Sequence, residues 1–459
     1  MHSLSIFGTS SDAGKSTLSF VITYLLAKRS IKVAPFKAQN VSNNSAVCDL
    51  GGEVAQPQFF AAESIGLQTT PDFNPVLLKS GRKNSASLIV NGYSVSEQDV
   101  REYYQKIDTL KPVVESAFLR LQEHFEVIVA EGAGSPVELN LMKKDLSNIY
   151  IADRFQTKII LVADIERGGV FASIWGVYNL LPKELQKNVI GVIVNKFRGD
   201  RTLFDEGVQI IEQRFGLKVL GVLPYKPFNL GFEDSQSLLN YKQDITEAKV
   251  KVAVIKLPHI SNFTDFEPLV LDKEIALHFI NTPQSLSMYD VLIIPGTKRT
   301  VDDLLWLKKS GFEKAIKHFG SILVAICGGY QMMYERIIDE EGIESEHKSV
   351  AGFGLIAGAV TFQKEKVVTK GSYELFGMQL KGYEIHNGVA QTIGVAKENF
   401  YGTFLHGLFD NDAFRKELFQ SFDYVGYDFN SYKRQKIESY ATMMEEFIDM
   451  DSIVAELQE

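Results

Sequence analysis

A glycine- and serine-rich loop near the N-terminus has the composition of a phosphate-binding loop. It follows the apolar run Leu4–Phe7 and precedes an apolar stretch with helical spacing. In such loops glycines let backbone amides approach the phosphates, the lysine adds a positive charge and the next hydroxyl binds Mg²⁺. Five residues separate Gly8 from Gly14, so Thr9 takes the usual place of the first glycine. We expect an ATP site that includes Gly8, Thr9, Ser11, Gly14, Lys15, Ser16 and Thr17, with Ser16 as a magnesium ligand.

Polar side chains follow other apolar runs of the same half. Glu131 comes directly after Val127–Ala130 and is followed by Gly-Ala-Gly, which leaves room for a triphosphate. A carboxylate there can bind Mg²⁺, although solvated loop acids are also common. Asp164 is a second candidate metal ligand. The amide of Asn195 could read the adenine edge, but an Asn after a strand is equally often structural.

Cys327 has the surroundings of a nucleophile. The run Ser321–Ile326 leads into Cys327-Gly328-Gly329 and then into a helical pattern. Small residues at such a turn permit a strained elbow that exposes a nucleophile, and a helix N-terminus stabilises a thiolate. The alternative is a small buried hydrophobic residue, which is our interpretation of Cys48.

A nucleophilic Cys needs a base, and the chain has eight histidines. His406 lies at a strand end between glycines, and His386 has similar surroundings. From the residues alone either histidine could be the base, and His406 is favoured. Backbone amides of Gly296 and Gly328 could form an oxyanion hole. A phosphate loop in one half and a Cys/His pair in the other predict two coupled reactions, activation by ATP and release of ammonia from glutamine.

Composition excludes several classes of protein. The chain has 459 residues, of which 45% are hydrophobic and 23% charged, as in packed globular proteins. Its net charge of -9 argues against a general nucleic-acid binder. The apolar runs are too short for a spanning helix, and two cysteines favour a reducing compartment, so we expect a cytoplasmic protein that binds neither nucleic acid nor membranes. Its expected partners are small-molecule substrates.

Alternating strand and helix patterns predict an α/β fold with a parallel sheet in each half. We expect an ATP-dependent domain over 1–235, a linker over 236–249, a glutaminase domain over 250–410 and a helical extension over 411–459. The expected strands are Leu4–Phe7, Lys32–Phe36, Val127–Ala130, Lys158–Ala163, Val189–Asn195, Val219–Leu223, Val250–Leu257, Tyr289–Pro295 and Ser321–Ile326, and the expected helices include Leu18–Lys28 and Val113–His124.

Longer stretches carry a resemblance that covers nearly the whole chain. The chain resembles the cobyric acid synthase family of glutamine-dependent amidotransferases in cobalamin biosynthesis. Its first half is similar to the dethiobiotin synthetase type of P-loop domain, and its second half to class I glutamine amidotransferases. The stretches that carry the resemblance are Pro35–Asn40, Asn74–Lys79, Ala163–Phe171, Asn195–Asp200, Ser261–Leu269, Pro295–Thr300, Gly382–Gly388 and His406–Phe409.

The resemblance implies ATP- and glutamine-dependent amidation of the b, d, e and g carboxylates of adenosylcobyrinic acid a,c-diamide through acyl phosphates. It also implies Cys327 as the nucleophile and His406, rather than His386, as its partner. Two departures stand out. Leu408 occupies the position where triad-type glutaminases usually carry Glu, an acid that this family also lacks. The segment Gly51–Gln58, which includes Pro57, lacks an Arg that the family commonly has there.

Two other functions compete with this interpretation. Cobyrinic acid a,c-diamide synthase combines the same modules, but Asn262–Glu267 and His406–Phe409 argue against it. A P-loop scaffold ATPase with a non-catalytic C-terminal domain would carry a lysine early in its loop, where this chain has Thr9-Ser10-Ser11-Asp12, and would leave the Cys327 elbow unexplained.

Overall fold

A computed structural model describes residues 1–80, 85–228, 230, 248–283 and 286–459. The chain forms two compact units, one of Met1–Ser42, Gly52–Phe232 and Arg434–Glu459, the other of Asn43–Gly51 and Glu233–Lys433. The predicted boundary at 235 and most of the predicted linker, 236–247, lie outside the described residues. The C-terminal residues are helical, in α14 (Asp412–Leu418), α15 (Phe429–Glu445) and α16 (Met450–Gln458).

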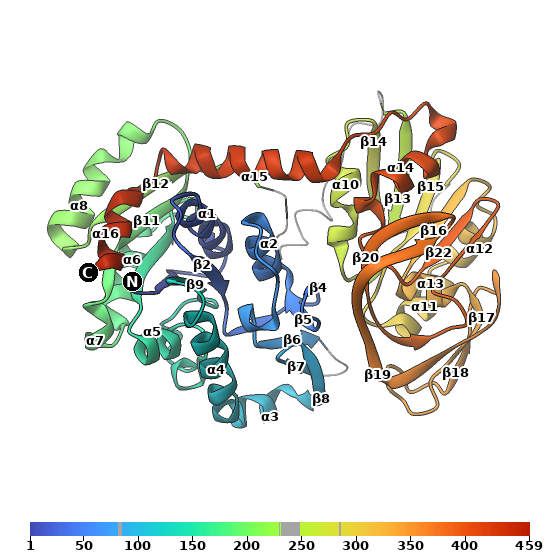
Figure 1. Cartoon of the computed structure of the whole chain (residues 1–459), viewed down its shortest axis with the longest axis horizontal. Helices are drawn as coiled ribbons and strands as arrows, with labels where there is room; N and C mark the ends of the chain where they lie inside the picture. The colour runs from blue at the N-terminus through green and yellow to red at the C-terminus, as the bar shows by residue number, and fades with distance from the viewer. Residues whose placement is uncertain (81–84, 229, 231–247, 284–285) are drawn as a thin grey trace. The chain divides into compact units, whose positions relative to one another are not determined.

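The first unit is built on a parallel sheet of six strands in the order β12-β11-β10-β1-β9-β2 (Figure 1). Its strands are continuous apolar runs because they are covered on both faces. Helix α1 (Lys15–Lys28) packs against β1, β2 and β9, α4 (Lys111–Gln122) against β9, and α6 (Val170–Leu180) against β10. These strands are β1 (Leu4–Gly8), β2 (Val33–Phe36), β9 (Val127–Glu131), β10 (Lys158–Asp164), β11 (Val189–Phe197) and β12 (Val219–Pro224).

The unit also contains a separate four-stranded sheet in the order β3-β6-β7-β8, and further helices. Both termini lie together, with the His2 amide donating to the Leu457 carbonyl at 2.7 Å (Figure 1). The remaining strands are β3 (Gln39–Val41), β5 (Glu53–Ala55), β6 (Val76–Ser80), β7 (Ser85–Val90) and β8 (Tyr93–Asp99). The helices are α1 (Lys15–Lys28), α2 (Gln56–Ser64), α3 (Val100–Gln105), α4 (Lys111–Gln122), α5 (Ile149–Phe155), α6 (Val170–Leu180), α7 (Lys183–Gln186) and α8 (Asp205–Phe215).

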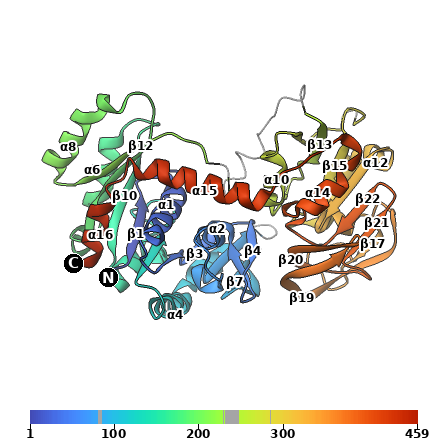
Figure 2. The same cartoon turned by 45° about the horizontal axis from the view of Figure 1, so that its top comes forward.

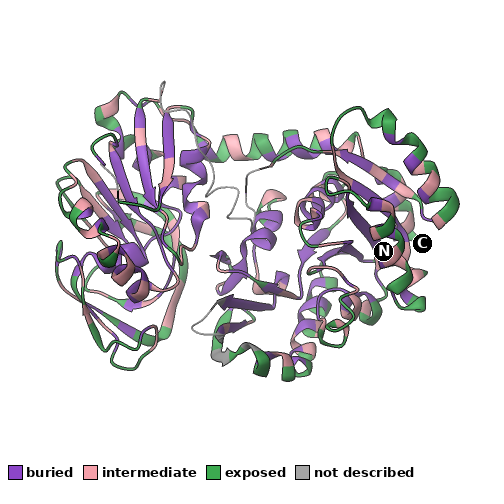
Figure 3. Cartoon of the chain, turned by 180° about the vertical axis from the view of Figure 1, so that it is seen from behind, coloured by how far each residue is buried: buried purple, intermediate pink, exposed green. Residues whose placement is uncertain are grey.

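The second unit has its own sheet in the order β14-β13-β15-β16-β22-β21, parallel except for the edge strand β21 (Figure 2). A further sheet, β18-β17-β19-β20, carries the long hairpin β19–β20. Figure 3 shows the strands of the main sheets mostly buried, whereas the helices carry a mixture of buried and exposed residues. The strands are β4 (Ser45–Val47), β13 (Val250–Ile255), β14 (Ile275–Ile280), β15 (Val291–Ile294), β16 (Ile322–Ile326), β17 (Tyr334–Ile338), β18 (Ser349–Ala351), β19 (Ile356–Leu375), β20 (Met378–Val389), β21 (Gly394–Lys397) and β22 (Phe400–Thr403).

The short helices of this unit are α10 (Glu267–Val270), α11 (Thr300–Lys309), α12 (Phe312–Lys317) and α13 (Gly328–Met332). The predicted fold class, a parallel α/β sheet in each half, is confirmed. The expected strands differ from the observed ones by a few residues at their ends. Glu131 and Asp164 are the last residues of β9 and β10 rather than the first loop residues after them. Both side chains therefore leave the carboxyl edge of the sheet, where parallel α/β folds bind ligands.

Candidate functional site

The phosphate loop joins β1 to α1 at the carboxyl edge of the first sheet. Gly14 has a left-handed backbone (φ 94°), and a Cβ atom there would lie 2.1 Å from Nδ2 of Asn195. That nitrogen donates to the Ala13 carbonyl at 2.9 Å, while Oδ1 of Asn195 accepts from the Lys196 amide at 2.8 Å. The side chain of Asn195, which was predicted to contact adenine, therefore supports the phosphate loop through a hydrogen bond to its backbone. Its role as a nucleotide contact stays a prediction.

Glu131 is the centre of the polar contacts beside this loop. The carboxylate is buried, and its Oε1 accepts hydrogen bonds from Oγ of Ser16 at 2.7 Å and from Nζ of Lys37 at 2.9 Å. Its Oε2 accepts from Nε2 of Gln58 at 3.0 Å. The structure therefore brings together the two predicted metal ligands Ser16 and Glu131. It adds Lys37 and Gln58, which the sequence interpretation had not singled out as site residues.

The residues at this position fit a magnesium ion. A hydroxyl and a carboxylate oxygen 2.7 Å apart are close to the separation of about 2.9 Å expected for neighbouring ligands of an octahedral Mg²⁺ with bonds of about 2.1 Å. Within the described ranges, His, Cys, Asp and Glu do not gather in groups of three or more that could hold a metal. Mg²⁺ in nucleotide sites typically takes one or two protein ligands and completes its shell with phosphates and water.

Lys15 and Asp164 are two further residues of the predicted ATP site, and their surroundings differ. Lys15 is buried, its Nζ lies 3.5 Å from the Ser10 carbonyl, and burial lowers the pKa of its ammonium against the opposing charge of Glu131. The groups that bond to Asp164 are not the other predicted metal ligands, Ser16 and Glu131. Its carboxylate pairs with Nζ of Lys196 at 3.0 Å and accepts from the Glu166 amide at 2.8 Å. Asp164 as a magnesium ligand stays a prediction.

Cys327 lies at the turn between β16 and α13. Its backbone has φ 50° and ψ −108°, a left-handed value that is strained for a residue with a side chain. The flanking glycines make room, because a Cβ on Gly329 would lie 2.2 Å from the Ile294 carbonyl. The thiol donates to the Ile385 carbonyl of β20 at 3.6 Å and is 6% exposed. This is the elbow geometry that the sequence predicted.

His406 follows β22 and is held by an acid from elsewhere in the chain. Its Nδ1 lies 2.7 Å from Oδ2 of Asp265, whose Oδ1 accepts from the Gly407 amide at 2.8 Å. Both side chains are buried, and the Tyr383 ring stacks on the imidazole with centroids 5.3 Å apart. Burial by itself would favour neutral imidazole. The charges of Asp265 and Cys327, with hydrogen bonds to both, outweigh it and raise the pKa of His406 to about 10.

The candidate oxyanion residues lie against the same pair. A Cβ on Gly296 would stand 2.9 Å from Cε1 of His406 and 3.6 Å from Cβ of Cys327. The Gly296 carbonyl accepts from the Ser261 amide at 3.0 Å, which braces the loop after β15. Gly328 is the first residue of α13, where backbone amides have no partner within the helix. Amides of Gly296 and Gly328 therefore remain the predicted oxyanion donors.

The strand order of the second sheet brings these site residues together. Asp265, Gly296, Cys327 and His406 follow β13, β15, β16 and β22, which are neighbours in one parallel sheet. The carboxyl ends of parallel strands meet at one edge, so four distant segments supply one site. His386, the other candidate base, lies on β20 with its Nδ1 2.7 Å from the Gly388 carbonyl and Nε2 3.1 Å from Glu384.

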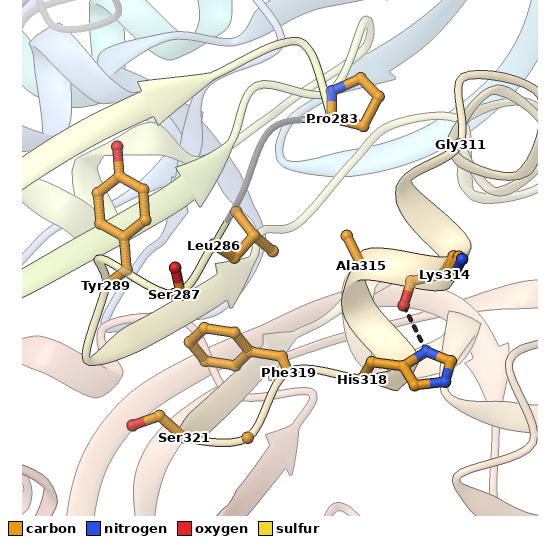
Figure 4. A pocket seen from close by; sticks show the side chains of 11 residues that line it. Pro283, Leu286, Ser287, Tyr289, Gly311, Lys314, Ala315, His318, Phe319 and Ser321 are labelled. Carbon is orange, nitrogen blue, oxygen red and sulfur yellow. Dashed lines mark hydrogen bonds between the residues drawn. The ribbon is translucent and has the colours of Figure 1, made fainter.

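A separate hollow of about 580 Å³ opens at the opposite, amino end of this sheet (Figure 4). Tyr289 and Ser321, which precede β15 and β16, line it together with Leu286, Ala315 and Phe319. The imidazole of His318 bonds the Lys314 carbonyl at 2.9 Å. The hollow contains neither Cys327 nor His406, so it is distinct from the Cys/His site.

Comparisons with known proteins identify both units. Residues 4–230 match the family model of the CobQ/CobB/MinD/ParA nucleotide binding domain, and residues 251–414 match that of the CobB/CobQ-like glutamine amidotransferase domain. A cobyric acid synthase of Acinetobacter baylyi is 52% identical over the full length of both chains. The chain belongs to the cobyric acid synthase family.

Other members of the family agree. A cobyric acid synthase of Limosilactobacillus reuteri is 37% identical over 100% of this chain and 99% of its own, and a probable cobyric acid synthase of Methanosarcina barkeri is 40% identical over 98% of each. The chain is therefore a glutamine-dependent amidotransferase of the carbon–nitrogen ligase class with a nucleotide-binding domain. In the described part of the chain, no helix is both long and apolar enough to cross a membrane.

Three residues of these sites escaped the residue-by-residue reasoning. Asp265, Lys37 and Gln58 each lie in a stretch already compared with the family, Ser261–Leu269, Pro35–Asn40 and Gly51–Gln58. The sequence feature that could have identified each of them is its place, as a polar residue, inside a stretch that resembles the family. Its partner could not be read from the sequence, because the partners lie 141, 94 and 73 positions away.

Proposed function

We propose that the chain amidates the b, d, e and g carboxylates of adenosylcobyrinic acid a,c-diamide to give adenosylcobyric acid. ATP and glutamine are the co-substrates, and Mg²⁺ is the expected cofactor. The observation that carries the proposal is the pairing of two sites in one chain of this family. One site presents Lys15, Ser16 and Glu131, and the other presents Cys327 and His406.

In the first site a substrate carboxylate attacks the γ-phosphorus of ATP, forming an acyl phosphate and ADP. This activation is needed because a carboxylate is a poor electrophile. Lys15 and the loop amides stabilise the charge on the transferring phosphoryl group, as in other P-loop enzymes. Ser16 and Glu131 would hold Mg²⁺, which neutralises phosphate charge when bound. Ammonia then displaces phosphate to give the amide.

In the second site Cys327 attacks the carboxamide carbon of glutamine. The raised pKa of His406 keeps its imidazole protonated at neutral pH, so it can donate a proton to the departing ammonia. Amides of Gly296 and Gly328 would stabilise the oxyanion. Water then releases glutamate from the thioester with His406 as the base. Asp265 fixes the Nδ1–H tautomer and the orientation of the ring throughout.

Incubation with candidate corrinoids tests this proposal. With glutamine and Mg-ATP, the a,c-diamide should lose mass stepwise as OH is replaced by NH₂, and both co-substrates should be required. Cobyrinic acid without amides should be a poor substrate. Preferential amidation at the a and c positions would instead assign the chain the earlier reaction on the ring. We place the reaction in the cytoplasm, where ATP and glutamine are available.

A further inference from the structure

Gln58 has a buried amide group of which only one half is paired. Its side chain is 3% exposed, and Nε2 donates to Oε2 of Glu131 at 3.0 Å. Among the described residues, no donor reaches its Oε1 atom. A buried acceptor without a donor costs about 1–3 kcal/mol, so such an oxygen beside a reaction site points to a donor on a ligand.

The neighbouring groups narrow the chemistry of that donor. Glu131 already receives three hydrogen bonds, from Ser16, Lys37 and Gln58 itself. Lys15 and Lys37 are cations that donate and cannot accept. The Gln58 oxygen is thus an acceptor available to an N–H group beside the phosphate loop, where donors and positive charge otherwise prevail.

The helix turn that carries Gln58 is stiff, and the bond from Nε2 to Glu131 orients its amide group. Gln58 lies in the first turn of α2, where Pro57 fixes the backbone angle and is well tolerated. The Ala55 amide, just before the helix, donates to Oδ1 of Asn74 at 3.3 Å. Pro57 therefore stiffens the turn that carries Gln58. An acceptor held in this way needs little reorganisation during a reaction.

We propose that Oε1 of Gln58 accepts a hydrogen bond from ammonia as it attacks the acyl phosphate, which makes Gln58 a catalytic residue of the amidation step. This inference rests on the proposed function. The C–N bond forms, the C–O bond to the phosphoryl group breaks, and phosphate leaves with that electron pair and takes up the proton lost from nitrogen. The nitrogen becomes more positive during attack, so its N–H is a stronger donor in the transition state than in free ammonia.

The test compares two methionine variants of the full chain with the wild type. Gln58→Met keeps the length of the side chain and removes the acceptor. Gln56→Met is the matched control, because Gln56 is a buried glutamine of the same turn whose Oε1 is likewise unpaired among the described residues. The substrates are the a,c-diamide corrinoid, Mg-ATP and ammonium chloride, without glutamine. Amide and ADP are measured separately.

For Gln58→Met, kcat/KM for ammonia should fall about 10- to 100-fold, the loss of one hydrogen bond to a charged nitrogen. The KM for Mg-ATP and the ADP formed without ammonia should change much less than amide formation. Phosphorylation precedes the step, and Glu131 keeps its bonds from Ser16 and Lys37 when the Nε2 donor of Gln58 is lost. The ratio of ADP to amide should therefore rise. Gln56→Met should behave like wild type.

Two results would overturn the role of Gln58. A parallel fall in ADP and amide would mean that Gln58 acts only by positioning Glu131, and an equal loss in Gln56→Met would mean that the helix turn is merely structural. A wild-type enzyme that forms ADP and no corrinoid amide would instead overturn the proposed function, which the amide assay of the unmutated chain decides first.

Discussion

The Asp265 carboxylate lies 2.7 Å from Nδ1 of His406, across 141 positions of sequence. In triad-type glutaminases the acid usually follows the histidine by two residues, where this chain has Leu408. The leucine is fully buried in the core under the site. The acid comes instead from the segment after β13, a strand of the same sheet that is separated from β22 by β15 and β16.

This relationship makes Asp265→Asn a direct test of the triad. Loss of the carboxylate should lower the pKa of His406 from its raised value of about 10. The protonated imidazole then persists over a narrower range, so the alkaline limb of glutaminase activity should move to lower pH. Turnover of glutamine should fall about 100-fold or more, as when the orienting acid of a catalytic triad is removed. Ammonia-dependent amidation should not change, and an unmoved pH profile would contradict the assignment.

Cys327→Ala should separate the two half-reactions. Glutamine-dependent amidation should be lost, because the variant has no nucleophile, while amidation at high ammonium should persist. Cys48→Ala, which removes the other buried thiol, is the control and should keep both activities. The measurement is amide formation with each nitrogen source. Loss of both activities in a well-folded Cys327→Ala protein would rule out two separate sites.

Gly296→Ala tests the close approach of the loop after β15. The added methyl group would stand 2.9 Å from Cε1 of His406, below the ordinary contact distance, and would push His406 away from the loop that carries the predicted oxyanion donor. We expect glutamine turnover to fall about 100-fold or more, the scale of losing an oxyanion donor. Gly320→Ala is the control, because its Cβ would meet nothing within 4 Å. If Gly296→Ala retains near-normal glutamine turnover, the oxyanion hole lies elsewhere.

Lys15→Ala should stop amidation with both nitrogen sources. The buried ammonium is expected to stabilise the transferring phosphoryl group, and removing one such contact should cost about 100-fold or more. Glutamine hydrolysis measured alone should continue, since Cys327 and His406 belong to the other unit. Lys183→Ala, at an exposed helix start, is the control. Near-normal amidation by Lys15→Ala would place the phosphates at another site.

The sequence predicted the six strands of the first sheet, and β13, β15 and β16 of the second, because these strands are unbroken apolar runs between turn signals. It did not predict β14, β21 or β22. It also identified the phosphate loop and the Cys327 elbow, since each depends on contiguous residues. Contacts between distant segments could not be predicted from the sequence. Nothing near Glu131 indicates that Gln58 and Lys37 will bond to it, and nothing near His406 points to Asp265. The contacts of Lys37 and Asp265 arise when the carboxyl ends of parallel strands are brought to one edge, whereas Gln58 comes from α2, outside those sheets.

The central claim is amidation of several carboxylates of one corrinoid through ATP activation. The most direct measurement is a time course of product masses from the a,c-diamide with glutamine and Mg-ATP, with ADP and glutamate counted in parallel. We predict successive products whose mass falls at each step by the difference between OH and NH₂, with partly amidated corrinoids seen before the final species. One ADP and one glutamate should form per amide. A product that gains phosphate, or no change in mass with any cobyrinic acid diamide, would contradict the account.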